Sequence, residues 1–334
     1  MRVLLIASKD DFFSSLEKVT GIGRYVRQTY ESLSKYLEVE KFPIYDYSSV
    51  LSAFLTTVTA SLSLRYRNFD IIHLLAPKPF IPLLKGNAKS VITVHDLFFL
   101  KYQESLSRLS RLYLLSIKKS DAVIAVSSKV KRDLIEMNYN KKIFVVNPFI
   151  DDKFFKEKKR NATEKKEDII KIGYIGKIDS ERKNVLRAIK AFKNLRENAL
   201  FELWGNHSTS NKIMQEIIKE IKKDKRIRLM GPAPEEDLIK IYDSFDAFFL
   251  PSKEEGFGYP IVEAQSRGIP VIVFEDSDIP EEVCKYCLKI NNDLNEIIDK
   301  ISDINRNALI SFAQKFNVNA YVKNLVNMYN EIIK

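Results

Sequence analysis

The stretch Pro251-Ser-Lys-Glu-Glu-Gly-Phe-Gly-Tyr-Pro-Ile-Val-Glu263 sets two carboxylates, Glu255 and Glu263, eight positions apart across a glycine turn. The apolar run before it predicts a strand, and Pro260 is a residue type that opens helices, so a strand, a turn and a helix are expected in succession. The glycines allow a ligand to approach the backbone, and the free amides of a helix start favour phosphate. A carboxylate one turn inside such a helix can accept two hydrogen bonds from a ribose diol. The pattern predicts a sugar-nucleotide site, with helix capping by the glutamates as the alternative.

The segments around this turn alternate between short apolar runs and helical patterns along the whole chain. Strands that alternate with helices predict parallel sheets covered by helices on both faces. A charged stretch that is poor in apolar residues, 151–170, separates two such series, and 334 residues exceed the usual size of a single core. The predicted fold is therefore α/β, with two facing Rossmann-like, doubly wound domains and a ligand cleft between them.

The boundaries expected for these domains are 1–150 and 171–316, with the charged linker region 151–170 between them and a final helix at 317–334. The first series predicts strands near Arg2–Ala7, Val39–Tyr45, Asp70–Leu75, Ser90–His95, Asp121–Val126 and Lys142–Asn147, and helices near Arg24–Tyr36, Val50–Arg65, Glu104–Lys118 and Ser128–Met137. The second predicts strands near Ile170–Gly176, Phe201–Gly205, Ile227–Gly231, Asp246–Ser252 and Pro270–Glu275, and helices near Asn184–Arg196, Asn211–Lys223, Glu235–Phe245 and Pro260–Ser266.

The positive charge of the chain lies in its first half. Residues 1–168 hold 29 Lys or Arg against 19 Asp or Glu, and the remainder holds 25 of each, out of totals of 54 and 44. A basic half suggests an anionic partner such as a phospholipid surface or a phosphorylated acceptor, unless the composition is simply basic throughout the source proteome. No motif of nucleic-acid-binding proteins is present, so we expect no nucleic acid partner.

No stretch has the length and apolar character of a membrane span or a signal peptide, so we expect a cytoplasmic protein. The two cysteines, Cys284 and Cys287, form a C-x-x-C without the second pair that zinc requires, and we expect no bound metal. Packed thiols are the favoured interpretation, with a local disulfide as the alternative.

A group of cations follows the first predicted strand of the second domain. The loop Gly173-Tyr-Ile-Gly-Lys-Ile-Asp-Ser-Glu-Arg-Lys-Asn184 places Lys177, Arg182 and Lys183 between that strand and the next helix. Cations beside a helix start can stabilise a pyrophosphate leaving group, whose negative charge grows as its bond to a sugar breaks. The alternative is that these side chains are merely solvated.

Two features of the first domain also follow predicted strands. Gly21-Ile-Gly23 precedes an apolar-periodic helix, and its amides are expected to meet a diphosphate; because the third glycine of the dinucleotide-binding motif is missing, an ordinary turn is the alternative. His95 terminates the strand Val91–Val94, where ligand sites of open sheets form, although a histidine at a strand end is often structural.

These motifs occur in one order through nearly the whole chain: Gly21-Ile-Gly-Arg24, Val94-His-Asp96, Tyr174-Ile-Gly176, Arg182-Lys-Asn184, Tyr242 with Asp246-Ala247, Pro251-Ser, Glu255-Gly-Phe-Gly258, Glu263-Ala264 and Gly268-Ile-Pro-Val271. In this order they resemble the family 4 retaining glycosyltransferases of the GT-B fold. The resemblance implies a metal-independent transfer of a sugar from a nucleoside diphosphate sugar to an acceptor, with the anomeric configuration retained. It also implies that the acceptor binds the first domain, the donor mostly the second, and that the last helix crosses back to the first.

By matched position, the resemblance implies that the cations hold the diphosphate, Glu263 the ribose and Glu255 the donor sugar. A front-face departure, in which the leaving phosphate assists deprotonation of the acceptor, is the mechanism it implies. The implied donor-binding residues are Gly21, Gly23, Lys177, Arg182, Lys183, Gly256, Phe257, Gly258, Tyr259 and Glu263, and the implied catalytic residues are Glu255, His95, Lys183 and Arg182.

Lys177 departs from the pattern, because the family often has arginine there and a point charge replaces a two-pronged donor. A sugar-nucleotide epimerase of similar fold and a non-catalytic sugar-nucleotide-binding subunit remain the alternative functions.

The segment Leu51, Phe54, Leu55, Val58 and Leu62 has helical spacing with hydroxyls opposite. It predicts either a helix packed on the sheet or a contact to a lipid-linked substrate. We therefore expect a saccharide or a polyprenyl- or otherwise lipid-linked acceptor, and a cytoplasmic protein that can sit peripherally at the inner membrane face through its basic domain.

Overall fold

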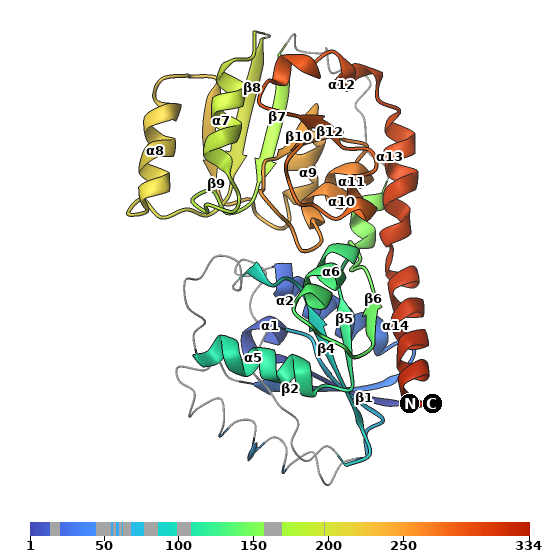
Figure 1. Cartoon of the computed structure of the whole chain (residues 1–334). Helices are drawn as coiled ribbons and strands as arrows, with labels where there is room; N and C mark the ends of the chain where they lie inside the picture. The colour runs from blue at the N-terminus through green and yellow to red at the C-terminus, as the bar shows by residue number, and fades with distance from the viewer. Residues whose placement is uncertain are drawn as a thin grey trace. The chain divides into compact units, whose positions relative to one another are not determined.

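The computed structural model of the chain describes residues 1–13, 21–44, 55, 58–59, 62, 68–76, 86–98, 108–156, 169–196 and 198–334. The chain forms two compact units, an N-unit of Met1–Phe149 with Val318–Lys334 and a C-unit of Ile150–Asn317. Each unit has a six-stranded sheet of parallel strands with helices packed around it (Figure 1). The predicted α/β fold class is therefore confirmed.

The sheet of the N-unit has the strand order β2-β1-β3-β4-β5-β6, and every adjacent pair is parallel. Strands β3 and β5 are buried along their whole length, as expected for a sheet with helices on both faces. The strands are β1 (Arg2–Ser8), β2 (Glu38–Ile44), β3 (Ile71–Leu74), β4 (Lys89–Val94), β5 (Ala122–Ala125) and β6 (Ile143–Val145). The helices are α1 (Lys9–Phe13), α2 (Gly21–Leu33), α5 (Arg108–Lys119), α6 (Ser128–Glu136) and, from the end of the chain, α14 (Val318–Ile333).

Helix α14 is joined to the N-unit by a buried network of hydrogen bonds. The Tyr321 hydroxyl donates to the Tyr25 hydroxyl at 2.9 Å, and the Tyr329 hydroxyl lies 2.6 Å from Nδ1 of His73. Thr93 joins the two halves, with its hydroxyl 2.8 Å from Nε2 of His73 and 3.3 Å from the Tyr25 hydroxyl. Burial lowers the pKa of His73 to about 3, so its ring is neutral and the network carries no charge.

The sheet of the C-unit has the order β12-β11-β10-β7-β8-β9. The chain leaves β7 toward β8 and β9 and then returns to the opposite side of β7 with β10, so the winding reverses between β7 and β10. Ligands of open α/β sheets bind beyond the carboxyl ends of the strands at such a point. The strands are β7 (Ile170–Ile175), β8 (Ala199–Trp204), β9 (Ile227–Gly231), β10 (Ala247–Leu250), β11 (Val271–Phe274) and β12 (Leu288–Ile290). The helices are α7 (Val185–Lys193), α8 (Lys212–Ile221), α9 (Leu238–Asp243), α10 (Tyr259–Ser266), α11 (Glu281–Cys284), α12 (Lys300–Asp303) and α13 (Arg306–Ala313).

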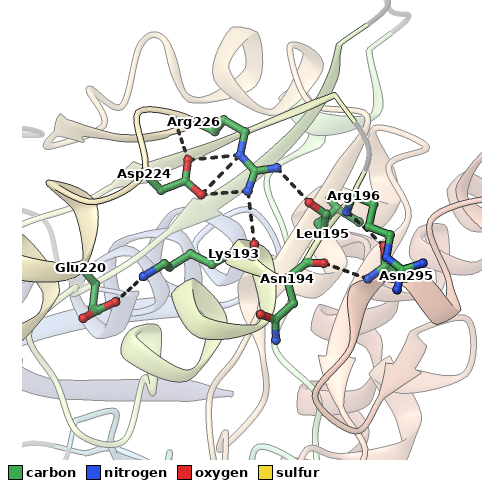
Figure 2. Close-up of polar contacts among 8 residues, drawn as sticks. All are labelled: Lys193, Asn194, Leu195, Arg196, Glu220, Asp224, Arg226 and Asn295. Carbon is green, nitrogen blue, oxygen red and sulfur yellow. Dashed lines mark hydrogen bonds and ion pairs between the residues drawn. The ribbon is translucent and has the colours of Figure 1, made fainter.

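The C-terminal end of α7 is capped by charged side chains (Figure 2). The Arg226 guanidinium donates to the carbonyl oxygens of Leu195 at 2.9 Å and Lys193 at 3.3 Å, which the helix itself leaves without partners. Both carboxylate oxygens of Asp224 accept from Arg226, at distances down to 2.8 Å. Lys193 in turn donates to Glu220 at 2.6 Å. Every cation of this cluster therefore has a partner within the C-unit.

Each predicted strand is present, and the differences lie in the connections. Helix α2 begins at Gly21 rather than at Arg24, β12 adds an edge strand, and a 3-10 turn at Asp152–Phe155 occupies the start of the charged stretch. Phe154 explains that turn, because its side chain is buried against the ring of Tyr242, 6.1 Å between centroids. The rest of the charged stretch, 157–168, lies outside the described residues.

The predicted helix at 50–65 lies largely outside the described residues. Of its apolar positions, Leu51 and Phe54 are not described, and Leu55 and Leu62 are about half exposed. Within the described ranges no helix has both the length and the apolar character needed to cross a membrane.

Candidate active site

The loops that the sequence singles out in the C-unit meet at the carboxyl ends of β7 and β10. These strands are neighbours, with Phe248 paired to Gly173. A side chain at Gly173 would lie 2.1 Å from the ring of Phe245, so only glycine allows this ring to pack on the strand. The loop after β7 carries Arg182 and Lys183, and the loop after β10 carries Glu255, so the reversal point of the sheet gathers charges of both signs.

Glu255 lies between the two cations. Its Oε1 accepts from Nζ of Lys183 at 2.6 Å, and its Oε2 accepts from Nη1 of Arg182 at 3.2 Å. The residue is only 7% exposed. Burial opposes its ionisation, but the attraction of Lys183 and Arg182 outweighs burial and holds the pKa of Glu255 below its usual range. The three side chains are thus ionised at neutral pH and together carry one net positive charge.

Backbone hydrogen bonds hold the loop around Glu255 in place. The Glu255 amide donates to the carbonyl oxygen of Asp278 at 3.2 Å, and the Asp278 amide donates to that of Lys253 at 2.8 Å. Arg182 also donates to the Glu254 carbonyl oxygen at 3.0 Å, and its own carbonyl oxygen accepts from the Lys253 amide at 2.8 Å. The loops after β7, β10 and β11 are therefore tied together, and the charged cluster is preorganised.

The glycine turn leads into α10 as the sequence predicts, with Pro260 in its first turn. Gly258 precedes the helix with a φ of +96°, a left-handed conformation that favours glycine. Glu263 lies one turn further along and is buried. Its Oε2 accepts from the hydroxyl of Tyr242 on α9 at 2.8 Å. The second predicted carboxylate is therefore also oriented by a specific partner.

Lys177 lies apart from this cluster. Its side chain is 67% exposed, and its Nζ lies 4.0 Å from Oδ1 of Asp179 rather than near Glu255. The structure thus brings together two of the three cations that the sequence groups in one loop.

The predicted site residues of the N-unit lie at the end of β4 and the start of α2. Nε2 of His95 donates to the carbonyl oxygen of Leu75 at 2.8 Å, and the His95 ring packs edge-on against Tyr25 at 4.8 Å. Burial lowers the pKa of His95 to about 4, so the ring is neutral at neutral pH. Gly21 and Gly23 lie in the first turn of α2, just before Tyr25, rather than in a free loop. A helix start is a position at which backbone amides can bind an anion.

Two family models match the chain in succession. The model described as Glycosyltransferase Family 4 matches residues 6–154, and the model described as Glycosyl transferases group 1 matches residues 155–323, about half of the chain. The chain belongs to glycosyltransferase family 4. The resemblance to this family seen in the sequence is thereby confirmed, whereas the retained configuration and the nucleoside diphosphate sugar donor remain predictions.

Relatives of this glycosyltransferase include O-antigen chain mannosyltransferase B of Escherichia coli, 32% identical over 114 residues. That alignment covers 33% of this chain and 30% of the relative, less than a third of its length. Sucrose-phosphate synthase from Thermosynechococcus elongatus has a TM-score of 0.75 at 18% identity, covering 99% of this chain and 98% of its own. Anabaena HepE, solved in complex with UDP and glucose, has a TM-score of 0.74 at 15% identity, covering 99% of this chain and 100% of its own. These structures confirm the GT-B fold.

Two contacts of the candidate site are not predicted from the sequence. The main-chain contact between Asp278 and Glu255 joins backbone groups, which leave no mark in a sequence. The hydrogen bond from Tyr242 to Glu263 joins positions 21 residues apart on two helices. Tyr242 belongs to the family pattern, so the signal was present without a role attached to it.

Proposed function

We propose that this glycosyltransferase moves a hexosyl residue from a nucleoside diphosphate sugar to a saccharide or a polyprenyl- or otherwise lipid-linked acceptor in glycan assembly. The observation that carries the proposal is the buried Glu255 held between Lys183 and Arg182 at the reversal point of the sheet. Two cations share one carboxylate there, so an arriving diphosphate finds positive charge that is only partly compensated.

In this proposal the diphosphate binds Arg182 and Lys183 and replaces Glu255 as their main partner. The cations then stabilise the negative charge that grows on the leaving group as the bond to the sugar breaks. Because departure and attack occur on one face, an oxygen of the leaving phosphate accepts the proton of the acceptor hydroxyl. No separate general base and no metal are needed in this scheme.

The other site residues position the donor. Glu255, freed from its ion pairs, accepts hydrogen bonds from hydroxyls of the sugar, next to the amides of Gly256, Phe257, Gly258 and Tyr259. Glu263, oriented by Tyr242, accepts from the ribose diol. The assignment of His95, Gly21 and Gly23 of the N-unit to the donor comes from the sequence and its resemblance alone and stays a prediction. Lys177, exposed beside the loop, supplies a weaker point charge.

The N-unit is the proposed acceptor side. Helix α5 places Arg111, Lys118, Lys119 and Leu115 at its exposed surface, which suits an anionic lipid headgroup. The name of the Escherichia coli relative, an O-antigen chain mannosyltransferase, supports mannose as the sugar and a growing glycan as the acceptor. We further propose that the enzyme works in the cytoplasm, peripherally at the inner face of the membrane.

A transfer assay with a matched pair of variants tests the proposal. Wild type, Lys183→Ala and Lys190→Ala are incubated with UDP- and GDP-linked hexoses and an acceptor panel, and nucleoside diphosphate release and product configuration are measured. Lys190 is an exposed cation on α7, the helix that follows Lys183, so its loss should leave turnover unchanged. Loss of Lys183 should lower kcat/KM by about 100-fold or more, as for other groups that stabilise developing charge.

Three outcomes would contradict the proposal. Equal turnover in the two variants would show that the charged cluster does not serve the transfer. An epimerised donor formed without any acceptor would identify an epimerase. Tight nucleotide binding without transfer to any acceptor would identify a non-catalytic subunit.

A further inference from the structure

The C-x-x-C of the C-unit closes the turn between α11 and β12. The Cys287 amide donates to the carbonyl oxygen of Cys284 at 3.0 Å, which is the hydrogen bond of a tight turn. The ends of such a turn lie within about 7 Å of each other, and a disulfide spans Cα separations of roughly 4.4–6.8 Å. Both thiols are free and partly exposed. The turn therefore places two reduced sulfurs where a disulfide can form and where a small molecule can reach them.

The two thiols differ in acidity. The contact with Cys287 stabilises the thiolate of Cys284 and lowers the pKa of Cys284, and Lys289 adds to this effect. The same contact, together with burial, raises the pKa of Cys287 well above its usual value. The sulfur of Cys287 also lies 4.0 Å from the carbonyl oxygen of Val283, to which it donates. We therefore assign Cys284 as the attacking sulfur and Cys287 as the resolving one.

A series of packed aromatic rings connects this turn to the glycine turn Gly256–Gly258, which our proposal assigns to the donor and which we call the donor turn. Tyr286, between the two cysteines, packs edge-on against Phe312 with 5.2 Å between centroids. Phe312 contacts Phe316 at 6.0 Å, and Phe316 contacts Phe257 at 5.5 Å. Phe257 is the residue between the two glycines of the donor turn, so the cysteine turn and the proposed donor site share one continuous set of rings.

Helix α10 provides a second connection. The amide nitrogen Nε2 of its buried Gln265 donates to the carbonyl oxygen of Val283 at 3.3 Å and lies 3.9 Å from the sulfur of Cys287. The side chain of Val283 also packs beside Gly258, 3.6 Å from where a Cβ would lie. A change at the cysteines therefore acts on both ends of α10, the helix that carries Glu263.

We propose that Cys284 and Cys287 form a reversible disulfide that lowers the affinity of the enzyme for its donor nucleotide. The co-reactant is a small-molecule disulfide. The Cys284 thiolate attacks one of its sulfurs and releases one thiol; the Cys287 sulfur, on losing its proton, then attacks Cys284 and releases the second thiol. The two cysteines lose two electrons and two protons, and the small-molecule disulfide gains both. Closure to the S–S length of about 2.05 Å shifts Tyr286 against Phe312.

Hydrogen exchange and thiol titration of the whole chain test this inference. The protein is equilibrated with reduced or oxidised glutathione, and free thiols, amide exchange of residues 255–260 and nucleoside diphosphate affinity are measured in each state. Oxidation should remove both free thiols, accelerate amide exchange in the donor turn and weaken nucleotide binding by about fivefold, a typical coupling between sites. Dithiothreitol should reverse all three changes. Cys284→Ser should show none of them, whereas Cys287→Ser can form only a mixed disulfide with glutathione, which mass spectrometry distinguishes from the internal disulfide.

A Phe312→Leu variant tests the route of the effect. It should still form the disulfide, while the changes in amide exchange and affinity become smaller. Failure of the disulfide to form in excess oxidised glutathione would overturn the inference, and so would a disulfide that leaves the exchange of 255–260 unchanged. Only the affinity measurement rests on the proposed function. If the reduced protein binds no nucleotide, the proposed function fails, and the exchange measurement still decides the inference.

Discussion

The two ends of helix α7 both gather charged side chains, yet they satisfy them in opposite ways. At the C-terminal end, Arg226 donates to the carbonyl oxygens of Lys193 and Leu195 and to Asp224, where the negative end of the helix dipole favours a cation. At the N-terminal end, Arg182 and Lys183 lie where the positive end of the dipole disfavours cations, and both pair with the single carboxylate of Glu255. The first arrangement stabilises the fold, and the second, in our proposal, binds the diphosphate of the donor.

Removing Glu255 should have the largest effect on the N-terminal end of α7. In Glu255→Ala two partly buried cations lose their shared carboxylate, so the free energy of unfolding should fall by about 3 kcal/mol. Added pyrophosphate should restore most of this loss, because it supplies the missing negative charge. Turnover should fall by about 100-fold, since the carboxylate also positions the sugar. Thermal unfolding with and without pyrophosphate, and a transfer assay, measure these effects.

The same variant separates the roles of the two carboxylates. Nucleoside diphosphate affinity of Glu255→Ala should be no lower than that of wild type, because the diphosphate contacts remain and the carboxylate that competes for the two cations is gone. Glu255→Gln, which keeps the shape of the side chain, is the matched control. If Glu255→Ala weakened nucleotide binding as much as Glu263→Ala does, the assignment of Glu255 to the sugar would be wrong.

Removing the opposite cap should change stability without changing catalysis. Arg226→Met leaves the carbonyl oxygens of Lys193 and Leu195 without their side-chain donor and removes the ion pair with Asp224, which keeps only the backbone amide of residue 226. This should cost about 2 kcal/mol of unfolding free energy. The turnover of the folded enzyme should match wild type. Lys225→Met, an exposed neighbouring cation, should change stability by less than about 0.5 kcal/mol. A fall in kcat of Arg226→Met under conditions where it is fully folded would show that this end of α7 also serves the reaction.

The two ends of α7 differ in how far their contacts can be predicted from the sequence. Arg182 and Lys183 follow a strand and precede a helix, so their place at the sheet edge is predictable from position alone. Arg226 lies 33 residues from the carbonyl that it caps, and a carbonyl oxygen is present in every residue, so no side-chain pattern marks the contact. The pairing of Lys183 with Glu255, 72 residues apart, is likewise visible only once the reversal between β7 and β10 is known.

The same distinction explains the fold. The buried strands are predictable because their apolar runs are continuous, as in Ala122–Ala125. The short edge strand Leu288–Ile290 is not predicted, because three residues on a partly exposed edge carry too little of an apolar pattern. The turn at Asp152–Phe155 escapes for another reason: one buried phenylalanine decides its packing within a segment whose composition is that of a linker.

Removing the second carboxylate, Glu263, should change nucleotide affinity. In Glu263→Ala the ribose diol loses its acceptor, so nucleoside diphosphate affinity should fall by about tenfold. A 2′-deoxy nucleotide should bind wild type with a similar loss and should bind Glu263→Ala with little further loss. Isothermal titration of the four combinations measures the coupling. Additive losses would show that Glu263 contacts some other part of the ligand.

Proton uptake is the finest test of the claim that a diphosphate replaces Glu255 as the partner of the cations. The folded-state pKa of Glu255 lies below its unfolded value, so this group contributes stability above about pH 4.5 and loses it as pH falls through the folded pKa. Once a diphosphate occupies Arg182 and Lys183, the attraction that lowers the pKa is gone and a second negative charge stands nearby, so the pKa of Glu255 must rise.

Binding near pH 4.5 should therefore take up a fraction of a proton, which calorimetry in buffers of different ionisation enthalpy detects. Glu255→Gln should lose this uptake, whereas Asp224→Asn at the other end of α7 should retain it, because the pKa of Asp224 is lowered by its hydrogen bond to Arg226, which the nucleotide does not touch. Uptake that persists in Glu255→Gln would mean that another group responds to the diphosphate and that Glu255 keeps its two cations in the complex.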